Sequence, residues 1–220
     1  MTLDDLPSLV DKLSVKNLVR KTTIPLDTDF AKVSGVVLAF DFAGGAGTQF
    51  DHLTPLLTPT SSTPADSRVR STLVLPYILP GRSVRYSEAL VSSQSLVVTE
   101  VFDQIVRPLL AARPANPVHL VLLGYSAGAS VAAEVAHRAM VVFGPKSDEM
   151  RRLRGIVLIA ESGPSHFVTP KEPSPATWSR ERMARYVEDT GVFEIADELK
   201  ADKAFYDTIL DRLSAGPCLV

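Results

Sequence analysis

The chain has 220 residues, of which 45% are hydrophobic and 22% charged, enough for one α/β domain with a substantial core. The formal net charge is −2 and the basic residues are scattered, which argues against nucleic-acid or membrane-surface binding. The only cysteine, Cys218, rules out an internal disulfide and favours a reducing, cytoplasmic compartment.

The N-terminal half begins with a helical pattern and continues with two strand patterns. Residues 6–19 carry apolar side chains at helical spacing, which predicts a short amphipathic helix. This helix is either a linker from a preceding domain or a helix that lies on the core. Residues 33–42 are rich in β-branched and aromatic side chains, which predicts a strand that ends at a glycine-rich segment. A helix over 48–57, interrupted near its end by Pro55, precedes a second strand over 70–77.

The second half continues this alternation. A helix is predicted over 86–110, a strand over 118–123, a helix over 130–140 and a strand over 154–160. Repeated alternation predicts a mostly parallel sheet with helices on both faces, an α/β fold. After a proline-containing stretch, residues 178–213 are charged and helical, which suits either a lid or a pair of ordinary packing helices.

The segment Gly124-Tyr125-Ser126-Ala127-Gly128 reads G-x-S-x-G between a predicted strand and a predicted helix. In that setting a tight glycine turn raises the serine hydroxyl above the sheet edge. Ser126 is therefore a candidate nucleophile, and the Ala127 N–H at the start of the helix is a candidate oxyanion donor. No Cys/His cluster has the spacing of a zinc site, so no metal is expected.

Four further segments, taken with this one, resemble the type II thioesterases, a family of the α/β-hydrolase superfamily. The segment 37–46 resembles their first-strand signature, and Leu79-Pro80-Gly81-Arg82 resembles their L-P-G-R motif. The segment 158–166 resembles the stretch after the next strand, and 183–213 resembles their helical lid. The resemblance implies one α/β-hydrolase domain over 1–220, with a leading helix or linker at 1–30, a lid insertion at 168–213 and a short C-terminal end.

The resemblance also implies an activity, the hydrolysis of acyl thioesters in polyketide, nonribosomal peptide or fatty acid biosynthesis. The acyl chain would arrive on the phosphopantetheine arm of a carrier protein, so the expected partner is an acyl carrier protein or a synthase domain, and no cofactor is expected. Ala43 would be the second oxyanion donor beside Ala127. The candidate substrate-binding residues are Phe42, Tyr125, Arg82, Phe167 and Trp178.

The sequence departs from the family pattern in three places. Tyr125 and Ala127 stand where the elbow usually has His and Met, and Asp41 replaces the usual proline. The family's catalytic acid and histidine lie beyond the lid, whereas this sequence stops at Val220.

Of the four histidines, two are too far along the chain from Ser126 to replace the missing base. His137 lies eleven positions beyond Ser126, about 16 Å along a helix, and His119 begins the strand at the opposite end. His52 fits a solvated helix surface. His166 follows the fourth predicted strand on the side where active sites form, and Glu161 ends that strand, so these two are the best substitutes for base and acid.

Two alternatives to a thioesterase remain. An incomplete, non-catalytic module would bind a carrier protein or a synthase partner without turnover, and a general carboxylesterase or lipase would share the G-x-S-x-G motif. A sheet that lacks its last strands would also expose an open edge, which a homodimer, a domain swap or a complementary fragment would cover.

Overall fold

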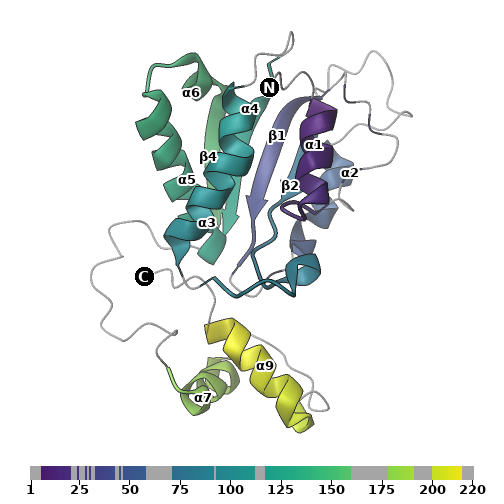
Figure 1. The fold of residues 1–220 in the computed structure, drawn as a ribbon, viewed down its shortest axis with the longest axis vertical. Coiled ribbons are helices and arrows are strands. Elements are labelled where there is room, and N and C mark those ends of the chain that lie inside the picture. The colour runs from purple at the N-terminus through teal and green to yellow at the C-terminus, as the bar shows by residue number, and fades with distance from the viewer. Residues whose placement is uncertain are drawn as a thin grey trace.

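A computed structural model describes the arrangement of the chain (Figure 1). It describes residues 6–20, 24, 28, 30, 33–42, 45, 47–57, 71–91, 93–111, 117–159, 178–190 and 200–214.

The centre of the described structure is a four-stranded, fully parallel sheet. Its strands are β1 (Val33–Phe40), β2 (Ser71–Pro76), β3 (His119–Tyr125) and β4 (Leu153–Ile159), in the order β2-β1-β3-β4. Parallel strands end at the same edge, so the segments after β1 and β3 meet there. The predicted α/β class and mostly parallel sheet are confirmed.

Helices cover both faces of this sheet, as predicted. Alternate strand residues such as Leu38 and Leu122 face a core built with α1 (Leu6–Val15), α3 (Gln94–Val101), α4 (Arg107–Ala111) and α5 (Ala127–Phe143). Ala39 and Leu123, one position further along their strands, face the 3-10 helix η3 (Thr48–Leu53) and α2 (Thr54–Leu57) instead. The period of two along each strand thus divides the apolar residues between two layers.

Helix α1 lies on the core, as one of the two interpretations of its apolar pattern predicted. Leu9, Val10 and Leu13 are all buried. The helix is shorter than predicted because Asn17 adopts a positive φ of 55° and the Leu18 N–H donates back to the Leu13 carbonyl at 3.0 Å. Such a left-handed residue is a common helix stop.

Proline marks two local differences from the predicted helices. Pro55 does not end the 48–57 helix, because it stands at the start of α2, where its missing N–H removes no bond. In the long helix that ends at Ala111, Pro108 follows a π-helical turn, η5 (Phe102–Val106). Pro108 has no N–H to donate to an earlier carbonyl, and the π-helical hydrogen bonds replace the α-helical ones just before it.

The start of one helix was predicted wrongly. The helix expected from residue 86 begins at Gln94, because residues 79–88 form the compact turn that contains η4 (Ser83–Arg85). Before β4 the chain forms a short helix, α6 (Asp148–Arg152). The Ser147 hydroxyl caps it by accepting the Met150 N–H at 3.1 Å.

Strand β4 is at the edge of the described sheet. Ile156, Val157, Leu158 and Ile159 are 43–46% exposed, so both faces of the strand are partly uncovered. An apolar strand edge of this kind is a surface on which another strand can pair. The expectation of an open, apolar edge therefore agrees with the described residues.

In the described part of the C-terminal region, helices α7 (Arg180–Thr190) and α9 (Lys203–Ser214) pack against each other through Met183, Val187 and Leu210. The pair lies at the end of the molecule toward which the strand arrows point (Figure 1). A role as a lid stays a prediction. Within the described residues, no helix is long and apolar enough to cross a membrane.

Candidate active site

The turn between β3 and α5 holds Ser126 in a backbone conformation that serine rarely adopts. Its φ is 49° and its ψ is −122°, outside the regions that L-residues favour. Such strain costs about 1–3 kcal/mol and persists only where the surrounding structure enforces it. A serine held in this way between a strand and a helix has the geometry of a nucleophile elbow.

The glycines on either side of Ser126 make this turn possible. A Cβ added to Gly124 would lie 2.4 Å from the Ala129 Cα, and one added to Gly128 would lie 2.2 Å from the Phe40 carbonyl oxygen. Both distances are far below any real carbon contact, and the atoms they meet belong to the backbone. The two glycines therefore let α5 start directly against β1 and β3.

Two backbone hydrogen bonds fix Ser126 in place. Its N–H donates to the Ile159 carbonyl of β4 at 2.8 Å, and its own carbonyl accepts the Ala129 N–H at 2.8 Å. Ala127 is the first residue of α5, so its N–H has no acceptor within the helix. The N-terminal end of a helix also favours developing negative charge.

The segment after β1 lies next to this turn and is organised by a buried carboxylate. Asp41 is only 7% exposed and accepts the N–H groups of Phe42 at 2.8 Å and Gly47 at 2.7 Å. The side-chain amide of Gln49 also donates to it. Burial raises the pKa of the Asp41 carboxyl above its usual range, although these three donors lower it in part.

The sequence motifs gave Asp41 no role beyond a departure from the family pattern. The available signal was an Asp at a strand end followed by a glycine-rich segment, where such side chains often accept nearby backbone N–H groups. A small cavity joins this residue to the elbow, with a lining that includes Asp41, Ala127 and Gly128.

Two of the predicted substrate-binding residues meet beside Ser126. The rings of Phe42 and Tyr125 pack edge to face, with centroids 6.2 Å apart and an interplanar angle of 89°. Both side chains are half-buried, so part of each ring is open to solvent. They form an apolar border at the carboxyl edge of β1 and β3.

Three histidines lie in the described residues, and none of them hydrogen-bonds to the Ser126 hydroxyl there. His119 opens β3, seven residues and about 23 Å from Ser126 at the usual rise per strand residue, and it contacts Arg154. His52 and His137 are exposed on η3 and α5. The expectation that His119 lies far from the elbow is confirmed, while His166, Glu161, Ala43 and Phe167 lie outside the described residues.

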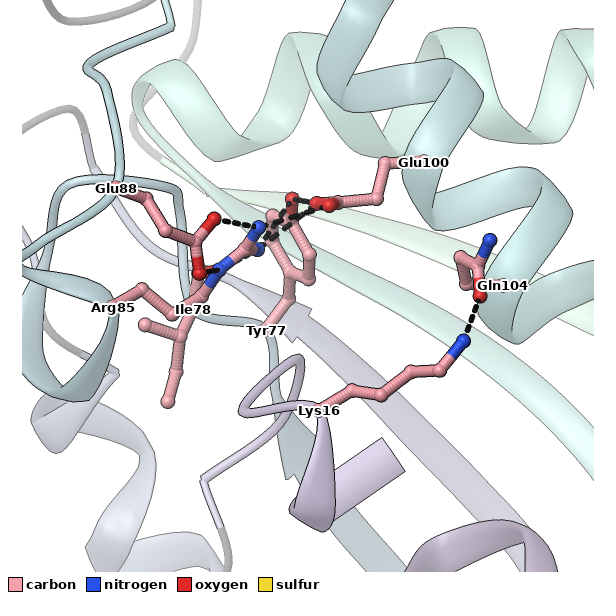
Figure 2. A network of polar contacts seen from close by, with 7 residues as sticks. All are labelled: Lys16, Tyr77, Ile78, Arg85, Glu88, Glu100 and Gln104. Atoms are coloured by element: carbon pink, nitrogen blue, oxygen red, sulfur yellow. Dashed lines mark hydrogen bonds and ion pairs between the residues drawn. The ribbon is translucent and has the colours of Figure 1, made fainter. Parts of the chain in front are cut away.

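The turn that carries the L-P-G-R motif is held by a charged network shown in Figure 2. Arg85, with a side chain only 3% exposed, donates to Glu88 at 2.6 Å and to Glu100 of α3 at 2.9 Å. It also donates to the Ile78 carbonyl at 2.8 Å, and Tyr77 donates its hydroxyl proton to Glu100. Arg85 therefore supports the turn from inside.

Burial disfavours the charged form of the Arg85 guanidinium, but its bonds to the two carboxylates outweigh this and raise its pKa. For the Tyr77 hydroxyl, burial and the nearby charge of Glu100 both raise the pKa. Both groups therefore keep their protons at neutral pH.

The remaining predicted contacts are placed as follows. Arg82 is 7% exposed, so its guanidinium is largely buried, and its role in substrate binding stays a prediction. Trp178 packs edge to face on Tyr186 at 5.3 Å and lies under the Arg182 guanidinium at 4.4 Å. The described residues contain no group of three or more His, Cys, Asp or Glu side chains suited to a metal ion.

Comparison with known proteins decides the family. The thioesterase domain family matches residues 36–216, which is most of the chain. The chain belongs to the thioesterase domain family. This confirms the family and the α/β-hydrolase-like fold that the motifs predicted, and no curated protein sequence gives a significant match.

Solved thioesterases share this fold at low sequence identity. The RedJ thioesterase from the prodiginine pathway of Streptomyces coelicolor is 21% identical, with a TM-score of 0.62 over 89% of this chain. The type II thioesterase BorB from the borrelidin cluster is 20% identical, with a TM-score of 0.58 over 91% of this chain. The chain spans 64% of the RedJ chain and 70% of the BorB chain.

Proposed function

We propose that this chain is a serine thioesterase, which hydrolyses acyl thioesters through an acyl-enzyme on Ser126. The observation that carries the proposal is the strained Ser126, enforced by Gly124 and Gly128 at the start of α5, in a chain of the thioesterase family. Strain of this kind lowers stability and is typical of functional positions.

The proposed reaction has two halves. The Ser126 hydroxyl attacks the thioester carbonyl while a base takes its proton, and the thiol leaves with that proton as the acyl-enzyme forms. Water then attacks the ester, the acid is released and the serine regains its proton. The N–H groups of Ala127 and Ala43 would hold the oxyanion, and His166, oriented by Glu161, is the proposed base.

The proposed substrate is an acyl chain on the phosphopantetheine arm of a carrier protein, and the proposed partner is that carrier or a synthase domain. Support comes from the family and from neighbours such as YbtT, a type II thioesterase from the yersiniabactin pathway, which is 18% identical with a TM-score of 0.56. The apolar pair Phe42 and Tyr125 would border the acyl chain.

The test is hydrolysis of a short acyl-N-acetylcysteamine thioester, followed as free thiol. We expect turnover by the chain, at least a hundredfold loss in Ser126→Ala, and little change in Ser130→Ala, which removes a second hydroxyl one turn along α5. Equal activity of Ser126→Ala and the unchanged chain would refute the proposal. A faster reaction with the matching p-nitrophenyl ester would favour a general esterase.

Two observations favour a second function. The described histidines are remote from Ser126 or exposed, and β4 leaves the edge of the described sheet open. An incomplete module of this kind would bind an acyl carrier protein without turnover. Binding of the carrier with no thiol release, and with turnover restored by a complementary fragment that supplies the base, would support this second function over the first.

A further inference from the structure

A cavity of about 170 Å³ lies between α1 and the π-helical turn η5. Its apolar lining comes from Leu9 and Leu13 of α1, which are 5% and 2% exposed, and from the half-buried Pro108. An apolar cavity of about 150 Å³ holds a molecule the size of benzene. This cavity therefore has room for a hydrocarbon body of about five or six carbons.

Two lysines border this apolar space. Lys12 lies in the last turn of α1, and Lys16 lies one turn further, where its N–H still donates to the Lys12 carbonyl at 3.2 Å. Residues four apart lie on the same side of a helix, and both lysines line the cavity. Like charges at this spacing repel each other, so an anion held between the two ammonium groups would relieve the repulsion.

The opposite wall of the cavity adds an amide. The Lys16 ammonium group reaches across to Gln104 of η5 and donates to its side-chain oxygen at 2.7 Å (Figure 2). This bond engages the amide oxygen, while the N–H2 group of the same side chain is a hydrogen-bond donor. Both walls thus present donors at the border of the cavity.

The carboxylate of Asp103 also lines the cavity, but arginines engage it from another side. Its Oδ1 lies 3.0 Å from the Arg107 guanidinium, and its Oδ2 lies 4.0 Å from that of Arg138. These two cations offset the charge of Asp103, so it repels a second anion only weakly. The lysines then determine the local charge, which favours an anion.

We propose that this cavity binds a short-chain carboxylate, an anion with an alkyl body of about five carbons. The chain lies on the apolar lining, and the carboxylate lies between Lys12 and Lys16. A bare inorganic anion would leave the apolar wall against water, and a neutral chain would leave the repulsion between the lysines in place. The described lining residues differ from those of the cavity beside the elbow, so binding here is independent of the proposed thioesterase function.

The test is titration calorimetry of the full chain with three probes: hexanoate, acetate and 1-hexanol. We expect saturable binding of hexanoate. Acetate lacks the chain and should bind roughly tenfold more weakly or worse. 1-Hexanol lacks the charge and should bind roughly fivefold more weakly, and added salt should weaken hexanoate but not 1-hexanol.

The test variant combines Lys12→Met with Lys16→Met, which keeps much of each aliphatic chain and removes both charges. We expect it to bind hexanoate roughly fivefold more weakly, about as weakly as 1-hexanol. Lys146→Met is the control, because Lys146 is exposed beyond the end of α5 and should not affect binding. In the unchanged chain, hexanoate should lower deuterium uptake by peptides covering residues 9–16 and 103–108.

Three results would overturn this site. The first is the absence of saturable hexanoate binding. The second is equal affinity for hexanoate in the double lysine variant and the unchanged chain, or equal affinity of the unchanged chain for hexanoate and 1-hexanol. The third is protection confined to the peptide around Ser126, which would place the bound acid at the elbow instead.

Discussion

Replacing Ser126 by glycine or by alanine tests whether the elbow stores strain. Both substitutions remove the hydroxyl, but only glycine adopts a φ of 49° with a ψ of −122° without steric cost. The strain for a residue with a side chain is about 1–3 kcal/mol. Glycine loses roughly 0.5–1 kcal/mol through the greater freedom of the unfolded chain. Ser126→Gly should therefore be more stable than Ser126→Ala by roughly 0–2.5 kcal/mol.

The sign of this difference is the informative result. At an ordinary helical position glycine is less stable than alanine, and Ala133→Gly on α5 supplies that control, with an expected loss of roughly 0.5–1 kcal/mol. For a chain of this size, each 1 kcal/mol corresponds to about 2–4 °C in Tm. Urea and thermal unfolding of the three variants and the unchanged chain give the comparison.

A Ser126→Gly protein that is about 1 kcal/mol less stable than Ser126→Ala would match the behaviour of an unstrained position. That result would refute the reasoning from strain to function. Equal losses at Ser126 and Ala133 on replacement by glycine would do the same.

Three further predictions concern the packing and charge around the site. Gly128→Ala should destabilise the protein by about 1–3 kcal/mol in urea unfolding and reduce thioester hydrolysis, because the new methyl group meets the Phe40 carbonyl. Gly155→Ala is the neutral control, because nothing lies within 4 Å of the added carbon. Glu100→Gln should lower the free energy of unfolding by about 1.5–3 kcal/mol, because it removes a charged acceptor from the buried Arg85. The control is Asp103→Asn, which weakens the more exposed ion pair with Arg107; a smaller loss in Glu100→Gln than in this control would contradict the prediction. Hydrogen bonds from Arg85 lower the pKa of Glu88, so the Glu88 carboxylate stabilises the fold fully above its ordinary pKa of 4.5 and loses this effect as the pH falls. Glu88→Gln should therefore flatten the fall in Tm between about pH 5 and pH 3. An unchanged slope would count against a stabilising Arg85–Glu88 pair.

The regular part of the fold followed from the sequence because strand and helix patterns there are local. The apolar run before Gly124 and the small residues after Ser126 predicted the strand, turn and helix that the structure shows. Boundaries failed where one residue's backbone decided them. The positive φ of Asn17, for example, stops α1 after Val15.

The site was predictable only in part. The strained turn at Ser126 was predicted because the G-x-S-x-G spacing fixes its geometry within a few residues, while the roles of Ser126 and Ala127 stay predictions. The burial of Arg85 and Asp41 depends on contacts with α3, η3 and α5, and sequence spacing does not show which charges meet across such distances. The L-P-G-R motif alone therefore did not show that Arg85 is engaged inside the protein.

The most direct test is to find the acylated residue. The chain is mixed with an acyl-N-acetylcysteamine thioester and quenched in acid, and the modified peptide is located by mass spectrometry, with Ser126→Ala in parallel. The account predicts one acyl group, attached as an ester to Ser126 and absent from the variant. Acylation at Cys218 or elsewhere with Ser126 unmodified, or thioester hydrolysis that continues in Ser126→Ala, would contradict it.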